Sequence, residues 1–313
     1  MTKRPGGGKL LFALALCAAA CIIGAFEASS ENVKNASEAS SIACVEDLIL
    51  LDNLLSVEPI SAEDGAIDAN VYTWRIEYLS GGYKVVGYIA APKDYLQAKK
   101  PYPVLIYCRG GNANTGMLEP PYASGLARNG VIIFASQYRE TILGSGKDEF
   151  GGADIEDVLS LIDFARRCAF LDGGHIALFG ESRGSIMVYE VLRIDGSICA
   201  AAVTGSVPDL KAAYEIRDQS MEKMLRYRVG GTPEEVPLEY EKRSAIYWAE
   251  EINTPMLIFH TQDDNRAPIE PVDTFVKKLK SLGKDVTYVR FETGGHCYCE
   301  KEVLWEFILR HVE

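Results

Sequence analysis

Residues 180–184 read Gly-Glu-Ser-Arg-Gly, a Gly-x-Ser-x-Gly pattern with Ser182 at its centre. The pattern is typical of a nucleophile elbow, in which the serine lies on a strained turn between a buried strand and a helix. Small flanking residues let the two elements approach closely. The pentapeptide alone also fits an ordinary strand-to-helix turn, but the apolar run 176–179 before it and the amphipathic segment 186–192 after it favour the elbow. We therefore predict that Ser182 is a catalytic nucleophile.

A serine hydroxyl needs a neighbouring base at neutral pH, and the base needs an orienting acid. The chain contains four histidines. His175 opens the elbow strand at the end remote from Ser182, His260 ends a later apolar run, and His311 falls in the last helical segment. His296 lies in a Gly-Gly-His loop after both the serine and a suitable loop acid, which gives the order serine, acid and histidine.

The acid is expected just after the apolar run 255–261, which has the pattern of a buried strand. Two neighbouring carboxylates, Asp263 and Asp264, follow that run. The carboxyl ends of strands in a parallel sheet are where such enzymes hold functional groups. The position of the run therefore supports an acid here and leaves both aspartates as candidates.

The elements around these residues predict an α/β fold with a mostly parallel sheet and helices on both faces. Period-two alternation over 71–78 and 83–91, with Gly81 and Gly82 between them, indicates an antiparallel hairpin. Apolar runs of strand length recur at 103–108, 131–136, 176–179, 198–204, 255–261 and 286–291. Helical periodicity is found at 154–167, where Asp154 could cap the helix, and at 272–282 and 303–312.

The predicted catalytic domain spans residues 70–313 and contains a small helical cap insertion at 209–251. Within that insertion, residues 210–228 are amphipathic and an acidic segment follows. Residues 42–69 are expected to form an N-terminal helical extension, because apolar residues recur at helical spacing from Cys44 to Leu55.

These features resemble the catalytic domain of the prolyl oligopeptidase family of serine peptidases, within the α/β-hydrolase superfamily. That family carries its acid in a stretch like His-Gly-x-x-Asp-x-x-Val-Pro, and residues 260–268 follow it with Ala267 for Val and Thr261 for the usual Gly. The resemblance implies Asp264 as the acid and His296 as the base. It extends over about residues 70–313, through matching stretches at 137–139, 150–152, 243–244 and 252–255. Ser185 departs from a second glycine often found after the elbow.

Attack on an acyl carbon requires two preorganised donors for the developing oxyanion. The amide of Arg183, immediately after the nucleophile, is one expected donor. Residues 109–112, Arg-Gly-Gly-Asn, resemble the family's His-Gly-Gly-Pro and imply the amide of Gly111 as the other, although the two glycines could also form a simple flexible turn. The side chains of Arg109 and Arg183 could bind a substrate carboxylate or be solvated.

The first 26 residues predict export. Lys3, Arg4 and Lys9 precede an apolar run from Leu10 to Phe26, as in a secretory signal. Three alanines before Cys21 resemble a bacterial lipobox, so that cysteine is expected to carry lipid; an ordinary cleaved signal and an uncleaved anchor are the alternatives. Residues 27–41 are small and polar, as in a flexible tether. We expect a cell-surface lipoprotein or a secreted protein.

The composition argues against nucleic acid as a partner, because the 313 residues carry a net charge of −12 and the basic residues are scattered. The eight cysteines do not form a disulfide framework. Cys297 and Cys299 lie beside His296, but a structural zinc ion needs four ligands and no second pair is visible. We expect no metal and no cofactor, and membrane contact only through the N-terminal signal or lipid.

Together these observations predict an exported serine hydrolase that cleaves an acyl bond through an acyl-enzyme. The resemblance favours peptide or amide substrates. Peptidases of that family usually carry a large β-propeller before the catalytic domain, and here only a short tether and extension precede it, so an esterase for small or carbohydrate-linked esters is the alternative. A non-catalytic surface binding protein is a further alternative, which would leave the combination of Ser182, Asp264 and His296 unexplained.

Overall fold

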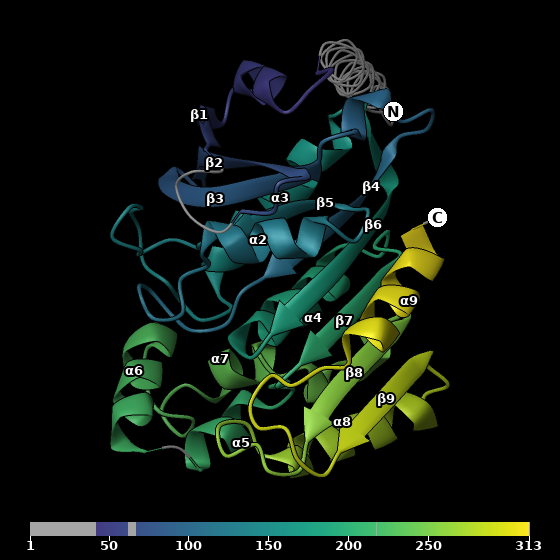
Figure 1. The fold of residues 1–313 in the computed structure, drawn as a ribbon. Helices are drawn as coiled ribbons and strands as arrows, with labels where there is room; N and C mark the ends of the chain where they lie inside the picture. The colour runs from purple at the N-terminus through teal and green to yellow at the C-terminus, as the bar shows by residue number, and fades with distance from the viewer. Residues whose placement is uncertain (1–41, 62–66, 217, 313) are drawn as a thin grey trace, which may run out of the picture.

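The structure, a computed structural model, describes residues 42–61, 67–216 and 218–312. A nine-stranded sheet runs through the molecule in the order β1-β2-β3-β5-β4-β6-β7-β8-β9 (Figure 1). Strands β1, β2, β3 and β5 pair antiparallel in succession, and every pairing from β5 to β9 is parallel. The expected mostly parallel α/β sheet is confirmed.

The strands are β1 (Leu54–Ile60), β2 (Val71–Ser80), β3 (Tyr83–Pro92), β4 (Tyr102–Cys108), β5 (Ile132–Ser136), β6 (Leu171–Glu181), β7 (Ala200–Thr204), β8 (Met256–Thr261) and β9 (Val286–Phe291). The α-helices are α2 (Pro120–Ala127), α3 (Glu156–Arg166), α4 (Arg183–Ile194), α5 (Leu210–Glu215), α6 (Gln219–Val229), α7 (Pro237–Lys242), α8 (Ile269–Ser281) and α9 (Lys301–Val312). Short 3₁₀ helices are η1 (Glu46–Leu50), η3 (Tyr95–Gln97), η4 (Ala153–Ile155), η5 (Ala245–Tyr247) and η6 (Ala249–Glu251).

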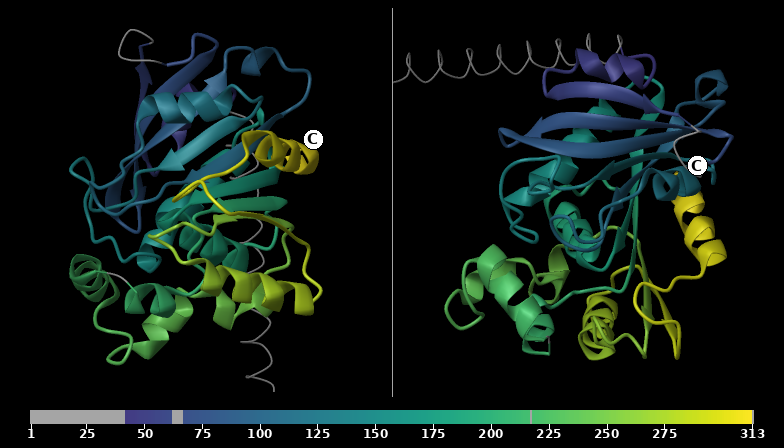
Figure 2. Two further views of the ribbon diagram at one scale, coloured as in Figure 1. Left: turned by 60° about the horizontal axis from the view of Figure 1, so that its bottom comes forward. Right: turned by 60° about the vertical axis from the view of Figure 1, so that its left-hand side comes forward.

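Helices cover both faces of the sheet (Figure 2). The core on one face contains buried side chains of α3, α4 and α8, and the core on the other face contains those of α2 and α9. Every residue of β5, β7 and β8 is buried as a result. This two-sided burial explains why these strands read as unbroken apolar runs rather than as alternating patterns.

The prediction of a helical extension over residues 42–69 is wrong. Within residues 42–61 and 67–69, η1 is the only helical element, and β1 pairs antiparallel with β2 at the edge of the sheet. Leu48 of η1 is buried, and the indole of Trp74 in β2 donates to the Glu46 carboxylate at 2.9 Å. The apolar residues that suggested a helix therefore pack a 3₁₀ turn and an edge strand against the hairpin β2–β3.

The helix expected at 154–167 begins later, at Glu156, and Asp154 does not cap it. Asp154 lies in η4 and is fully buried, and its carboxylate accepts hydrogen bonds from the amides of Gly151 and Gly152. A buried carboxylate is costly unless it is paired and hydrogen-bonded. Asp154 therefore belongs to an interior charge network rather than to a helix end.

The segment 209–251 contains α5, α6, α7, η5 and η6, which lie far from the hairpin β2–β3 (Figure 1). The amphipathic stretch 210–228 forms two helices, α5 and α6, rather than one. Asp209 caps α5 by accepting from the Ala212 amide at 3.0 Å. Helices α5, α6 and α7 contribute Leu210, Leu225 and Tyr240 to a small apolar core that also contains Phe150 and Ile186 of the main domain.

The predicted signal (1–26) and tether (27–41) lie outside the described residues. Across residues 42–61, 67–216 and 218–312, no helix combines the length and apolar character needed to cross a bilayer.

Candidate active site

Ser182 lies on the turn between the end of β6 and the first residue of α4. Its backbone has φ 52° and ψ −121°, a conformation that costs a non-glycine residue about 1–3 kcal/mol. The glycines on either side allow the sharp turn. A Cβ at Gly184 would overlap the carbonyl oxygen of Cys108, and a Cβ at Gly180 would press on the carbonyl of Gly184. The sequence thus folds into the elbow that its Gly-x-Ser-x-Gly pattern predicts.

His296 connects Ser182 to Asp264. The Ser182 hydroxyl is 2.8 Å from Nε2 of His296, and Nδ1 of the same ring is 2.8 Å from Oδ2 of Asp264. Asp264 is buried and also accepts from the amides of Arg266 and Ala267, both at 2.9 Å. Burial by itself would raise the pKa of Asp264, but the hydrogen bonds from His296 and the two amides lower it below its ordinary value.

Asp263, the second candidate acid, has a different position. Its carboxylate accepts from the amide of Gly295 at 2.8 Å and from that of Gly294 at 3.2 Å. These hydrogen bonds, chiefly the one from Gly295, lower the pKa of Asp263. Asp263 therefore holds the backbone of the loop that carries His296, while Asp264 contacts the imidazole.

The other three histidines make local contacts away from Ser182. Nε2 of His260 is 2.8 Å from the carbonyl oxygen of Ala267, and burial lowers the pKa of this ring. His175 is paired with Asp172, and His311 contacts the carbonyl of Phe307 in its own helix.

The loop after β4 carries Gly110 and Gly111 past the elbow. Gly111 has φ +71°, and a side chain there would overlap the Thr115 carbonyl. A Cβ at Gly110 would lie 3.2 Å from Cβ of Ser182, so the loop passes close to Ser182. Within the described part of the chain, the amides of Gly111 and Arg183 donate to no other protein group. Both residues line the cavity that contains Ser182.

Arg109 shapes this loop from inside. Its guanidinium is buried and donates to the carbonyl oxygens of residues 110, 113, 115, 116 and 137. A planar group with five donors is suited to holding several carbonyls in one geometry. Neither alternative expected for the Arg109 side chain, a substrate carboxylate or solvent, is therefore correct.

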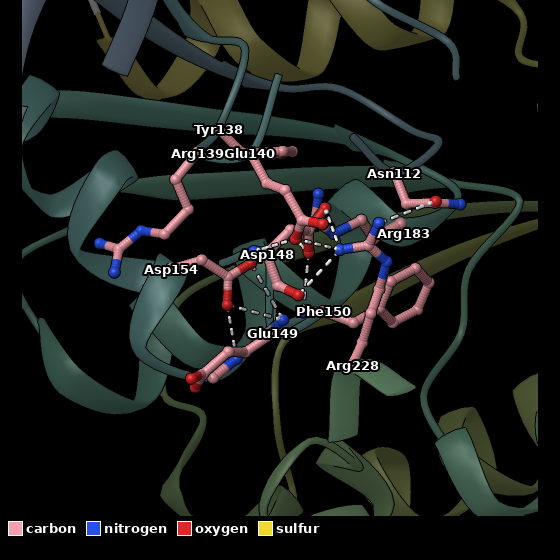
Figure 3. Close-up of polar contacts among 12 residues, drawn as sticks. Asn112, Tyr138, Arg139, Glu140, Asp148, Glu149, Phe150, Asp154, Arg183 and Arg228 are labelled. Atoms are coloured by element: carbon pink, nitrogen blue, oxygen red, sulfur yellow. Dashed lines mark hydrogen bonds and ion pairs between the residues drawn. The ribbon is translucent and has the colours of Figure 1, made fainter. Parts of the chain in front are cut away.

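Arg183 points into a buried charge network, which Figure 3 shows in close-up. Its guanidinium pairs with Asp148 at 2.9 Å and with Asp154, and it lies over the Tyr138 ring, 4.2 Å from the ring centre. The Arg183 side chain is therefore also neither solvated nor free for a substrate. Asp148 in turn accepts from the amide of Ala113 at 3.1 Å, which connects the elbow helix to the loop after β4.

Arg228 brings helix α6 into the same network (Figure 3). Its guanidinium donates to the Glu140 carboxylate at 2.8 Å and to the Asp148 carbonyl at 2.9 Å, and it lies 3.6 Å from the Asp148 carboxylate. Burial alone would raise the pKa of Asp148, but Arg183 and Arg228 together lower it. Sequence reasoning missed this network, since nothing in the local pattern pairs charges so far apart in the chain.

A cavity of about 970 Å³ lies over Ser182. One side of it is apolar and comes from the insertion and its neighbours, with Phe150, Val207, Leu210 and Leu225 among the lining residues. His296, the loop after β4 and Glu181 contribute polar groups to the lining of the cavity. The arrangement gives a hydroxyl, a base and free amide donors around a space that can admit an acyl compound.

Comparisons with known proteins agree with this geometry. The model of the prolyl oligopeptidase family matches residues 126–310. The chain belongs to the prolyl oligopeptidase family. It is therefore a serine hydrolase, as its motifs predict.

Among relatives, the uncharacterized peptidase YtmA of Bacillus subtilis (strain 168) is 32% identical over 234 residues, or 74% of this chain and 89% of that protein. Dipeptidyl-peptidase 5 of Porphyromonas gingivalis is 25% identical over 203 residues, or 59% of this chain and 29% of that protein. The solved acylaminoacyl peptidase of Pyrococcus horikoshii shares the fold with a TM-score of 0.65 at 20% identity, over 82% of this chain and 42% of that one. The chain thus spans 89% of YtmA but only 29% of dipeptidyl-peptidase 5 and 42% of the solved acylaminoacyl peptidase.

The cysteines beside His296 are neither paired with each other nor part of a metal-ligand cluster among the residues that the structure describes. Cys297 and Cys299 are free thiols, and the pKa of each is raised mainly by burial. Within the described ranges, no group of three or more His, Cys, Asp or Glu side chains could hold a metal ion. His296, which a zinc site would have used, is instead hydrogen-bonded between Ser182 and Asp264.

Proposed function

We propose that this member of the prolyl oligopeptidase family cleaves acyl bonds through an acyl-enzyme, with Ser182 as nucleophile, His296 as general base and Asp264 as the orienting acid. The observation that carries the proposal is the continuous chain of hydrogen bonds through His296, 2.8 Å to Ser182 and 2.8 Å to Asp264. Nucleophile, base and orienter within hydrogen-bond reach of one another are the mark of an activated serine.

In the first step, the Ser182 oxygen attacks the acyl carbon and its proton moves to Nε2 of His296. Asp264 keeps Nδ1 protonated, so Nε2 is free to accept. Negative charge develops on the carbonyl oxygen, and the amides of Gly111 and Arg183 are the proposed donors to it. The imidazolium then gives its proton to the leaving group. Water repeats the sequence on the acyl-enzyme and releases the acid.

The substrate is proposed to be a small peptide or amide. Two kinds of similarity support this proposal: the chain's relatives bear peptidase names, and its fold neighbours include acylaminoacyl peptidases. A panel of dipeptidyl and acyl-aminoacyl amides set against short-chain esters separates this proposal from the esterase alternative. Higher kcat/KM for all esters than for every amide would contradict it.

The nucleophile is tested with a fluorophosphonate probe, which should label Ser182 because the elbow exposes its hydroxyl to the cavity and His296 can activate it. Peptide mapping of the labelled protein locates the adduct. Ser182→Ala should abolish labelling, whereas Ser220→Ala, a change at another serine lining the cavity, should retain it. A label on another residue, or none on folded protein, would refute the proposed nucleophile.

We also propose that the protein is exported and anchored through lipid on Cys21. The support is the sequence of residues 1–41 alone: a charged start, an apolar run, three alanines before Cys21 and a polar tether. Intact mass of the native protein should show loss of the residues before Cys21 and a diacylglyceryl adduct. A mature protein without the adduct would refute the lipid anchor.

A further inference from the structure

Glu181, the last residue of β6, immediately precedes the nucleophile and lines the same cavity. Two tyrosines from different elements hold its carboxylate. Tyr107 of β4 donates to Oε2 at 2.6 Å, and Tyr122 of α2 donates to Oε1 at 2.7 Å. Burial, followed by the charge of Glu181, raises the pKa of both phenols, so both remain protonated donors. The carboxylate therefore has a fixed position next to Ser182.

None of the described cationic side chains neutralises this carboxylate. Among the described residues, Glu181 forms no ion pair with a lysine, arginine or histidine. Two arginines among the cavity-lining residues have other partners. Arg109 donates to backbone carbonyls, and Arg183 pairs with buried aspartates. Arg266, an exposed residue that also lines the cavity, makes no ion pair with Glu181. The negative charge of Glu181 is therefore uncompensated within a partly enclosed space.

A carboxylate offers about four lone-pair sites, and the tyrosines occupy two of them. The remaining sites are suited to a donor that brings positive charge, because charge-assisted hydrogen bonds are shorter and stronger than neutral ones. A second carboxylate or phosphate at this place would be repelled. The chemistry that fits is thus a primary ammonium or a guanidinium group.

We propose that Glu181, fixed by Tyr107 and Tyr122, is a subsite for a positively charged amine of the substrate close to the scissile bond. The protein then prefers acyl compounds that carry a free amine over neutral ones of the same shape. This inference rests on the proposed function, because the subsite has meaning only if Ser182 is the nucleophile. The competing explanation is that Glu181 only ties β4, β6 and α2 together.

The test is protection of Ser182 from a neutral fluorophosphonate by three ligands of similar size and different charge: n-butylammonium, n-butanol and n-butyrate. In the wild-type protein, n-butylammonium should slow labelling at a concentration about tenfold lower than n-butanol, as expected for one hydrogen bond to a charged group. Butyrate should protect least. Equal protection by n-butylammonium and n-butanol, or better protection by butyrate, would overturn the proposal without any variant.

Two matched variants then locate the effect. Glu181→Gln should reduce the advantage of n-butylammonium over n-butanol to less than about threefold. Glu119→Gln removes the same charge from another exposed cavity-lining residue, whose side chain caps no helix, and should keep the advantage. An equal loss in both variants would indicate a diffuse field and overturn the subsite. If wild-type protein is not labelled at all, the proposed function fails and this inference fails with it, whereas labelling without charge preference refutes the subsite alone.

Discussion

At the scale of single residues, two adjacent aspartates hold His296 in different ways, one through its ring and the other through the backbone of its loop. Asp264 is buried and contacts Nδ1 of His296, whereas Asp263 is exposed and binds the amides of the glycine loop. Neighbouring side chains at the end of a strand point in different directions, so one reaches the imidazole and the other reaches the backbone that carries it. The two carboxylates act on the same ring by different means.

Asp264→Asn should lower kcat by roughly 10⁴-fold with little change in KM, because an amide at this position favours the wrong tautomer of His296. Asp263→Asn should keep kcat within about tenfold, since an amide oxygen can still accept from the Gly295 amide. Steady-state kinetics of the two purified variants measure this, with circular dichroism as the check on folding. Loss of turnover in Asp263→Asn alone would reverse the two roles.

The residues proposed to carry chemistry could be read from the sequence, while the residues that hold them in place could not. Ser182 and His296 are marked by glycines and by their order along the chain. The sequence also singles out Arg183, but only because its amide follows Ser182 and is an expected oxyanion donor. Its side chain pairs with Asp148, which lies 35 residues away, and no local periodicity reports a contact of that kind. Such pairs are decided by tertiary packing, which a single sequence does not display.

At the scale of elements, the hairpin β2–β3 could be predicted from the sequence, whereas the edge strand β1 could not. Burial alternates along most of β2, and Gly81 and Gly82 separate it from β3, so the hairpin was predictable even though the middle of β3 is continuously buried. Strand β1 has a mixed burial pattern and contains Pro59, which fits an edge strand but gives no clear period. Because β1 is stabilised by its pairing with β2, the β-propensity of its own residues does not predict this strand.

Arg228 connects helix α6 to polar groups of the main domain, in addition to the apolar core to which Leu225 contributes. This guanidinium reaches Glu140, Asp148 and the side chain of Asn112, which lies in the loop proposed to supply an oxyanion donor. The insertion, which contributes apolar residues to the cavity, is thereby connected to the loop beside Ser182. Displacement of α6 should disturb both substrate packing and the Gly111 amide.

Arg228→Met should lower the free energy of unfolding by about 3 kcal/mol, because it leaves Glu140 without its cation and Asp148 with only Arg183. It should also lower kcat/KM, since the loop at Asn112 loses a contact. Chemical denaturation and steady-state kinetics measure the two effects. The matched control is Arg226→Met on the same helix, whose exposed pair with Glu235 at 3.9 Å should contribute less than about 1 kcal/mol. Equal effects of the two changes would contradict the anchoring role of Arg228.

At the scale of the whole molecule, the sheet brings together segments that are distant in sequence. Ser182 follows β6, Asp264 follows β8, and His296 follows β9, so three parallel strands deliver the three groups to one end of the sheet. The buried strands hold these ends at fixed spacing. The geometry of the three proposed catalytic groups is therefore a consequence of sheet packing, and the loops complete it.

The interior also contains an acid that the proposed mechanism does not use. Glu190 of α4 has a buried carboxylate oxygen without a hydrogen-bond partner in the described part of the chain. Burial raises its pKa from 4.5 to about 7, although Arg193 and Arg243 oppose the shift. The folded state therefore holds this proton more tightly than the unfolded chain does.

The consequence is a pH dependence of stability with a definite sign. Between pH 4.5 and about 7 the native state binds more protons at Glu190, so the free energy of unfolding falls as pH rises, and the loss is complete above pH 7. Glu190→Gln removes the titration and should raise the free energy of unfolding at pH 8 by on the order of 2 kcal/mol, with the gain vanishing towards pH 4.5. Urea denaturation at several pH values measures it, with exposed Glu302→Gln as a control that should change stability by less than about 0.5 kcal/mol at each pH. A gain that is the same at pH 5 and pH 8 would mean that packing, and not the buried charge, is responsible.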